Sequence, residues 1–195
     1  MALWGTSDAD ESKPKNLTTA EKKEVFANNS GWVREAGSIW SGNDNTDADP
    51  EVLVAVSGLA DSIGAADVTE VEWITSTADK SAGFTLSVRV RWNEVVTVTG
   101  NPTLAVTNGN QGSGSGRGPH TLVYASGTGT NELVFSLAIA AANAATNAND
   151  VLSIGAQTIA LAGGTIKDTA DGTTVSARAI SGTQGTAAGT VTVVA

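Results

Sequence analysis

The sequence predicts an all-β protein, a sandwich or a barrel, preceded by an N-terminal arm that contains one short helix. Two patterns lead to this prediction. Apolar and polar residues alternate with period two from residue 52 onward, and turn residues interrupt the alternation about every 8–12 residues. The chain is also rich in Gly, Ala, Thr, Ser, Val and Asn, a composition typical of β-structure with many tight turns.

The predicted division of the chain places an attachment arm in residues 1–50 and the sandwich in residues 51–195. Within the arm, Thr18 and Glu21 have the spacing of a capping box. Good helix formers follow Thr18, so we expect a single helix over residues 19–28. A helix this short is not stable alone and must dock on other parts of the chain.

The clearest predicted strand spans residues 84–92, where apolar and polar side chains alternate strictly. Residues 132–139 repeat the pattern. Strict alternation indicates strands with one buried face. The predicted core residues are Phe84, Leu86, Val88, Val90, Leu133, Phe135, Leu137 and Ile139, with Arg89 and Arg91 on the opposite face. Further strands are predicted at residues 52–56, 68–75, 95–99, 102–107, 120–126, 151–154, 157–161, 173–179 and 189–194.

Charge and composition exclude several classes of function. The chain has 20 acidic residues against 11 Lys and Arg, for a net charge of −9, so we expect no nucleic-acid or anionic-membrane partner. It contains no Cys, and its single histidine, His120, cannot form a multi-histidine metal site. No apolar run approaches the ~18 residues of a membrane span. We expect no cofactor.

Candidate catalytic and metal-binding groups have simpler structural explanations. Glu70 and Glu72 share a strand face, which a pair of glycosidase carboxylates would need, but a solvated outer face is favoured. For His120 we favour a strand edge or the surface over a catalytic base, and we favour a structural turn for Asp168 and Asp171. The sequence therefore predicts a protein that is not an enzyme.

The acidic loop at residues 43–49 offers oxygen ligands that suit Ca²⁺, although it fails the EF-hand pattern. A calcium site therefore remains an alternative there.

The five tryptophans divide into two groups. Trp73 and Trp92 lie within strand patterns and are expected in the core. The others lie in the irregular first quarter of the chain, where they either pack onto the sandwich or bind a partner, since Trp is prominent at interface hot spots. The predicted partner-binding residues are Leu3, Trp4, Phe26, Trp32 and Trp40. On this view residues 1–40 are needed for attachment and dispensable for folding of the sandwich.

Residues 84–174 carry a resemblance to a known family. The matching stretches are FTLSVRVRWNEVVTVTGNPTLAV, TLVYASGTGTNELVFSLAI and LSIGAQTIALAGGTIKDTADGTT. In order and spacing they resemble a bacterial immunoglobulin-like repeat of surface proteins and adhesins. Ala162 replaces the usual Asn, and Asp171-Gly172 replaces the usual Gly-Asn. The resemblance implies an immunoglobulin-like β-sandwich. It says little about function, because such domains mostly bind other molecules or act as spacers.

A second resemblance covers the N-terminal residues. LWGTSD (3–8) and KPKNLTTAEKKEVFANNSGWV (13–33) are similar to the start of virion structural proteins from tailed phages of marine bacteria. Together the two resemblances imply a virion protein, most simply a capsid decoration (cement) protein on the outer head surface. Its expected partners are the major capsid protein and neighbouring copies of itself. The alternatives are a tail, neck or fibre component and a carbohydrate-binding adhesin module.

Overall fold

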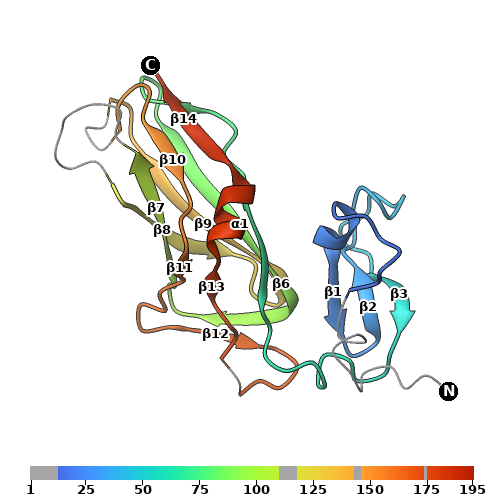
Figure 1. Cartoon of the computed structure of the whole chain (residues 1–195). Helices are drawn as coiled ribbons and strands as arrows, with labels where there is room; N and C mark the ends of the chain where they lie inside the picture. The colour runs from blue at the N-terminus through green and yellow to red at the C-terminus, as the bar shows by residue number, and fades with distance from the viewer. Residues whose placement is uncertain (1–12, 110–117, 143–145, 174) are drawn as a thin grey trace.

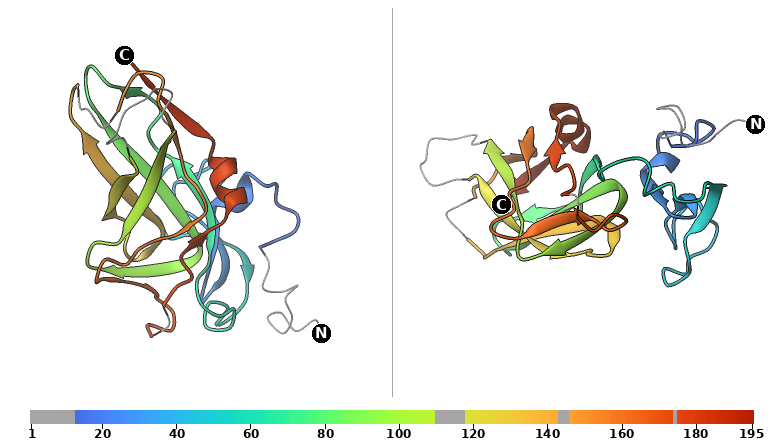
Figure 2. Two further views of the ribbon diagram at one scale, coloured as in Figure 1. Left: turned by 60° about the vertical axis from the view of Figure 1, so that its left-hand side comes forward. Right: turned by 90° about the horizontal axis from the view of Figure 1, so that it is seen from below.

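The computed structural model describes residues 13–109, 118–142, 146–173 and 175–195. It confirms the all-β prediction. Strands β4 to β14 form an elongated sandwich, and three short strands, β1 to β3, lie beside one end of it (Figure 1). The C-terminus lies at the end of the sandwich away from β1–β3 (Figure 2). We call residues 13–63 the N-terminal module.

The elements of the module are η1 (Glu21–Glu24), β1 (Val25–Asn28), β2 (Gly31–Arg34) and β3 (Glu51–Ala55). The sandwich comprises β4 (Val68–Trp73), β5 (Ala78–Asp79), β6 (Phe84–Thr99), β7 (Thr103–Gly109), β8 (His120–Ser126), β9 (Thr130–Ile139), β10 (Val151–Ser153), β11 (Gln157–Thr158), β12 (Thr165–Asp168), β13 (Ala179–Ile180), α1 (Gly182–Ala188) and β14 (Thr190–Val194).

The central strand of the sandwich is β6, which merges the two strands predicted at residues 84–92 and 95–99. It pairs antiparallel with β9, β4 and β12. The hydrogen-bonded path continues through β8, β7, β10 and β14 to β5. Because β5 contacts β6 and α1 packs against β4, the path folds over on itself and encloses a core.

The predicted core face of the sandwich is confirmed. Six of the eight predicted residues are buried, and Phe84 and Leu137 are half-buried against the same cluster. Arg89 and Arg91 lie on the opposite face of β6. Alternation along a strand assigns faces correctly because successive side chains point to opposite sides of the sheet.

The predicted helix at residues 19–28 is wrong in extent and type. Thr18 and Glu21 do form the expected reciprocal bonds: the Thr18 N–H donates to the Glu21 carboxylate (2.8 Å), and the Glu21 N–H donates to the Thr18 hydroxyl (3.3 Å). Only the single 3₁₀ turn η1 follows, and residues 25–28 form strand β1. Pairing of β1 with β2 satisfies the backbone groups that a helix would have used.

Residues 21–55 of the predicted arm and of the segment after it therefore form a small sheet with one 3₁₀ turn rather than an extended strand of chain. Strand β3, predicted as part of the sandwich, pairs with β2 instead. The module has its own core of Val25, Ala27, Trp32 and Leu59. Strands β1 and β2 show no alternation of apolar and polar residues, because each has four residues and almost all of them are buried.

Candidate functional site

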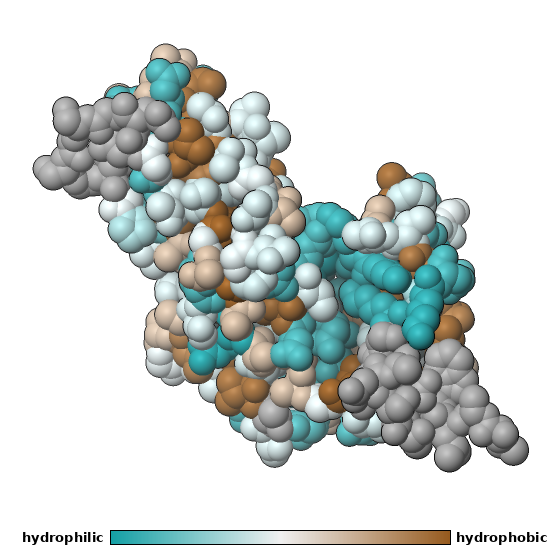
Figure 3. Space-filling model, viewed as in Figure 1, coloured by the Kyte–Doolittle hydropathy of each residue, from teal (hydrophilic) through white to brown (hydrophobic). Residues whose placement is uncertain are grey.

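The module docks on the outer face of the sandwich through an ion-pair network centred on Arg91. The Arg91 guanidinium lies 2.7 Å from Glu72 and 3.1 Å from Glu70, both on β4, and also contacts Glu132 of β9. From the module, Glu35 approaches it at 3.7 Å. Figure 3 shows hydrophilic residues gathered on both sides of the hollow between the two parts. Arg91 thus connects the sheet face with the module that covers it.

Lys23 and Asn131 extend this network across the junction. The Lys23 ammonium pairs with Glu70 and lies 3.3 Å from Glu72. The Asn131 amide donates to Glu35 at 2.8 Å. Burial raises the pKa of Glu72, but Arg91 and Lys23 more than offset this and lower it below its ordinary value. These carboxylates hold the module in place, so the predicted solvated outer face is instead an internal junction.

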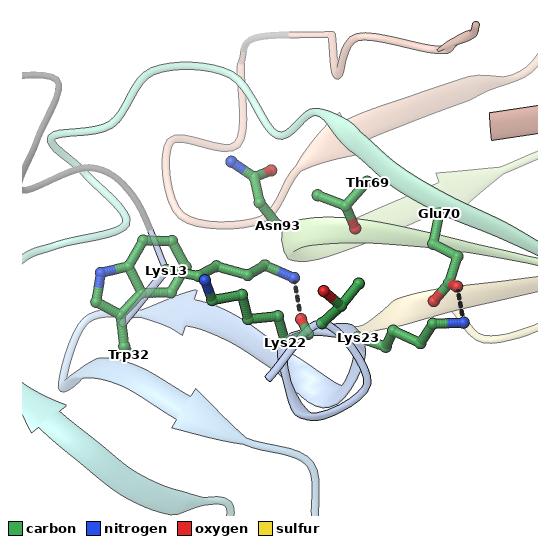
Figure 4. Close-up of a pocket in the computed structure, with 8 residues that line it drawn as sticks. Lys13, Lys22, Lys23, Trp32, Thr69, Glu70 and Asn93 are labelled. Carbon is green, nitrogen blue, oxygen red and sulfur yellow. Dashed lines mark hydrogen bonds and ion pairs between the residues drawn. The ribbon is translucent and has the colours of Figure 1, made fainter. Parts of the chain in front are cut away.

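A cavity of about 410 Å³ lies in the same junction and is lined by three lysines (Figure 4). The Lys13 ammonium donates to the backbone carbonyl of Lys22 at 2.6 Å, and Lys23 points to Glu70. Burial lowers the pKa of Lys13 to about 8. Two of the three ammonium groups are therefore committed to contacts within the chain, which makes the cavity part of the docking interface.

A second cavity, of about 290 Å³, is lined in part by Glu94, whose carboxyl group is buried. In β6, Glu94 lies between Trp92 and Val96 in the alternating series of buried residues, and it pairs with Ala27 of β1. The side chain is 0% exposed, and neither oxygen has a hydrogen-bond partner within the described residues. Burial raises its pKa to about 8, and four nearby carboxylates add to the effect: Asp168, Asp67, Asp171 and Asp61.

The structure describes three of the five predicted partner-binding residues, two of them buried and one exposed. Leu3 and Trp4 lie outside the described residues. Phe26 and Trp32 are 6% and 1% exposed, so both side chains face the interior of this chain rather than a partner. Trp40 is 48% exposed and remains available for contact. Its neighbour Ile39, which the sequence analysis did not single out, is 81% exposed.

The remaining sequence candidates have structural roles. His120 is 5% exposed and its ring lies 3.3 Å from the Asn108 amide, and burial lowers its pKa. It is therefore a core histidine rather than a surface one. Asp168 accepts hydrogen bonds from the backbone N–H groups of Ala66 (3.1 Å) and Ala170 (2.8 Å). Asp171 closes the following turn by accepting from the Thr173 N–H at 2.7 Å.

In the acidic loop at residues 43–49, the Asn43 and Asn45 side chains accept from backbone N–H groups two residues on. Within the part of the chain that the structure describes, no group of three or more His, Asp or Glu residues is arranged to hold a metal ion. In the same residues, no helix is long and apolar enough to cross a membrane.

Two of these features, the buried Glu94 and the exposed pair Ile39 and Trp40, have a recognisable signal in the sequence. Glu94 is a carboxylate in the core phase of an otherwise apolar strand face, which is a recognisable anomaly. Ile39 and Trp40 are adjacent apolar residues within a polar loop.

No family model matches the chain, and the searches of curated proteins and of solved structures found no match either.

Proposed function

We propose that this chain is a phage virion structural protein, most simply a capsid decoration protein that attaches to the outer head surface through its N-terminal module. The observation that carries the proposal is the exposure of Ile39 and Trp40 on a module that has its own core and is tied to the sandwich. Exposed adjacent large apolar residues on an ordered module are typical of a protein–protein contact.

The division of the molecule into two parts supports this function. The module supplies the contact, and the sandwich, whose sequence is rich in Thr, Ser and Gly, extends away from it. On a particle with many equivalent sites, a contact of modest affinity is sufficient, because copies that also touch their neighbours gain avidity. The resemblance of residues 3–33 supports the same class of protein, and the resemblance of residues 84–174 is compatible with it, because immunoglobulin-like domains mostly bind other molecules or act as spacers.

The first experiment measures copy number by quantitative mass spectrometry of purified virions. A decoration protein is expected in a number comparable to the major capsid protein. Tens of copies or fewer would favour the tail, neck or fibre alternative. Absence from virions would refute the proposal.

The second experiment mixes the purified protein with undecorated capsids and measures co-sedimentation. Saturable binding is the expected result. A shift with glycans in a binding array, together with no capsid binding, would favour the adhesin alternative.

A further inference from the structure

The loop between β2 and β3, residues 35–50, carries the exposed side chains of Ile39 and Trp40 on a backbone held by hydrogen bonds. The Arg34 guanidinium donates to the Trp40 carbonyl at 2.8 Å, and the Trp40 N–H donates to the Ser38 hydroxyl at 3.2 Å. Ser41 donates in turn to the Ser38 carbonyl at 2.8 Å. These bonds hold the backbone around Trp40, and a loop whose backbone is already held loses less conformational entropy on binding, so this tip is suited to recognition.

One side of the loop lines a cavity together with residues of the sandwich. Thr46, Ala48 and Pro50 face the start of β9 across a cavity of about 400 Å³. Gly37 also approaches Thr46 so closely that a Cβ at Gly37 would lie 2.6 Å from the Thr46 methyl carbon. The loop therefore has an inner side, which lines this cavity, and an exposed part that carries Ile39 and Trp40, which we call its outer side.

The surroundings of this tip are acidic. The loop and the first residue of β3, residues 35–51, contain five acidic residues and no Lys or Arg. Within and next to the loop, four acidic residues are exposed: Asp44, Asp47, Asp49 and Glu51. The outer side of the loop is therefore an apolar contact next to a cluster of negative charge.

This charge determines which partner fits. A second copy placed tip to tip would bring two acidic loops together, and like charges across an interface disfavour such a contact. A partner with Lys and Arg around an apolar depression gains from both features. We propose that the outer side of the loop at residues 35–50 docks on such a basic protein surface, with Trp40 and Ile39 in the depression. The inference rests on the proposed function and names the contact used for attachment.

The test is binding of purified variants to undecorated capsids at several salt concentrations. Trp40→Ala is expected to weaken binding about thirtyfold or more, as for a hot-spot residue. The double variant Asp47→Asn/Asp49→Asn should weaken binding at low salt about tenfold and flatten its salt dependence, because screening removes the same attraction.

The matched control is Asp61→Asn/Asp67→Asn. It makes the same change in charge in the connection between β3 and β4, which leaves the module at the end opposite the β2–β3 loop (Figure 1). We expect wild-type binding and salt dependence. All of these side chains are exposed, so melting temperatures should match the wild type and show that each variant is folded.

The outcomes separate the two proposals. Wild-type protein that does not bind capsids refutes the proposed function, and this inference with it. Wild-type binding that Trp40→Ala and the Asp47/Asp49 variant leave unchanged refutes the inference alone. Concentration-dependent self-association of the isolated protein that Trp40→Ala abolishes would also overturn it, since the tip would then dock on a second copy.

Discussion

Replacement of Glu94 by Gln should remove a pH-dependent loss of stability. In the folded protein the carboxyl is buried without a hydrogen-bond partner in the described residues, and its pKa is about 8. In the unfolded chain it titrates near the ordinary value of 4.5. Between these values the folded state binds one more proton than the unfolded state, so the free energy of unfolding falls as pH rises.

The magnitude follows from the two pKa values. The wild type should lose up to about 1.4 kcal/mol per pH unit between pH ~4.5 and ~8, with an upper bound of about 5 kcal/mol, and no more above that window. Gln keeps the shape and stays neutral, so Glu94→Gln should gain relative to the wild type over the same range. For a chain of this size the melting temperatures should separate by on the order of 10 °C by pH 9.

The assay is thermal unfolding of both proteins from pH 4.5 to pH 9. Glu35 has a pKa raised to about 7, chiefly by burial, and adds a slope of the same sign in both proteins, so only their difference reports Glu94. Asp44→Asn makes the equivalent change from carboxylate to amide at an exposed residue and should follow the wild type at every pH. Parallel curves for the wild type and Glu94→Gln would refute the reasoning.

Three further predictions concern the module and its junction. Trp32→Ala empties the centre of the module core and should cost about 3–5 kcal/mol in the free energy of unfolding, measured by denaturant titration; an unchanged midpoint would contradict the burial of this side chain. Arg91→Met leaves four carboxylates without their shared cation and should cost about 3–5 kcal/mol at neutral pH and less at pH 4.5; equal losses at both pH values would argue against an electrostatic origin. Gly31→Ala would place a Cβ 2.0 Å from the Val54 carbonyl oxygen at a φ of +130°, so hydrogen exchange in β2 and β3 should accelerate. Gly42→Ala also carries a positive φ (+71°) but has open space around it, so it isolates the effect of the clash and should change exchange in those strands much less.

Much of the sandwich could be predicted from sequence because its long strands have one buried face. Nine residues of strict alternation in the first part of β6 identified Leu86, Val88 and Val90 as core, and β9 supplied the matching face. The short strands β1, β2, β5 and β12 were not predicted, since two to four positions are too few to show a period, whereas β10 and β11 lie within predicted strands. Helix α1 was also missed, although Ser181 and Gln184 form its capping box.

The candidate site could be predicted only in part. Sequence pointed to Trp32 and Trp40 together, as aromatic residues in an irregular segment, and left open whether they pack internally or bind a partner. The structure places Trp32 in the module core and Trp40 at the surface of the β2–β3 loop. Nothing local distinguishes the two, because the difference depends on Leu59 and on the strand β3 that packs beside Trp32.

The sequence by itself determined the all-β class and the core face of the long strands, because the side chains of a strand alternate between its two faces and neighbouring residues show this alternation directly. It also placed Arg91 on the outer face of β6. Only the tertiary structure decided that the module covers this face and that Arg91 is the centre of a junction. The physical reason is the sequence distance between the residues involved. Alternation among neighbours fixes the side of the sheet on which a residue lies, whereas its burial depends on residues distant in the sequence that fold against that side.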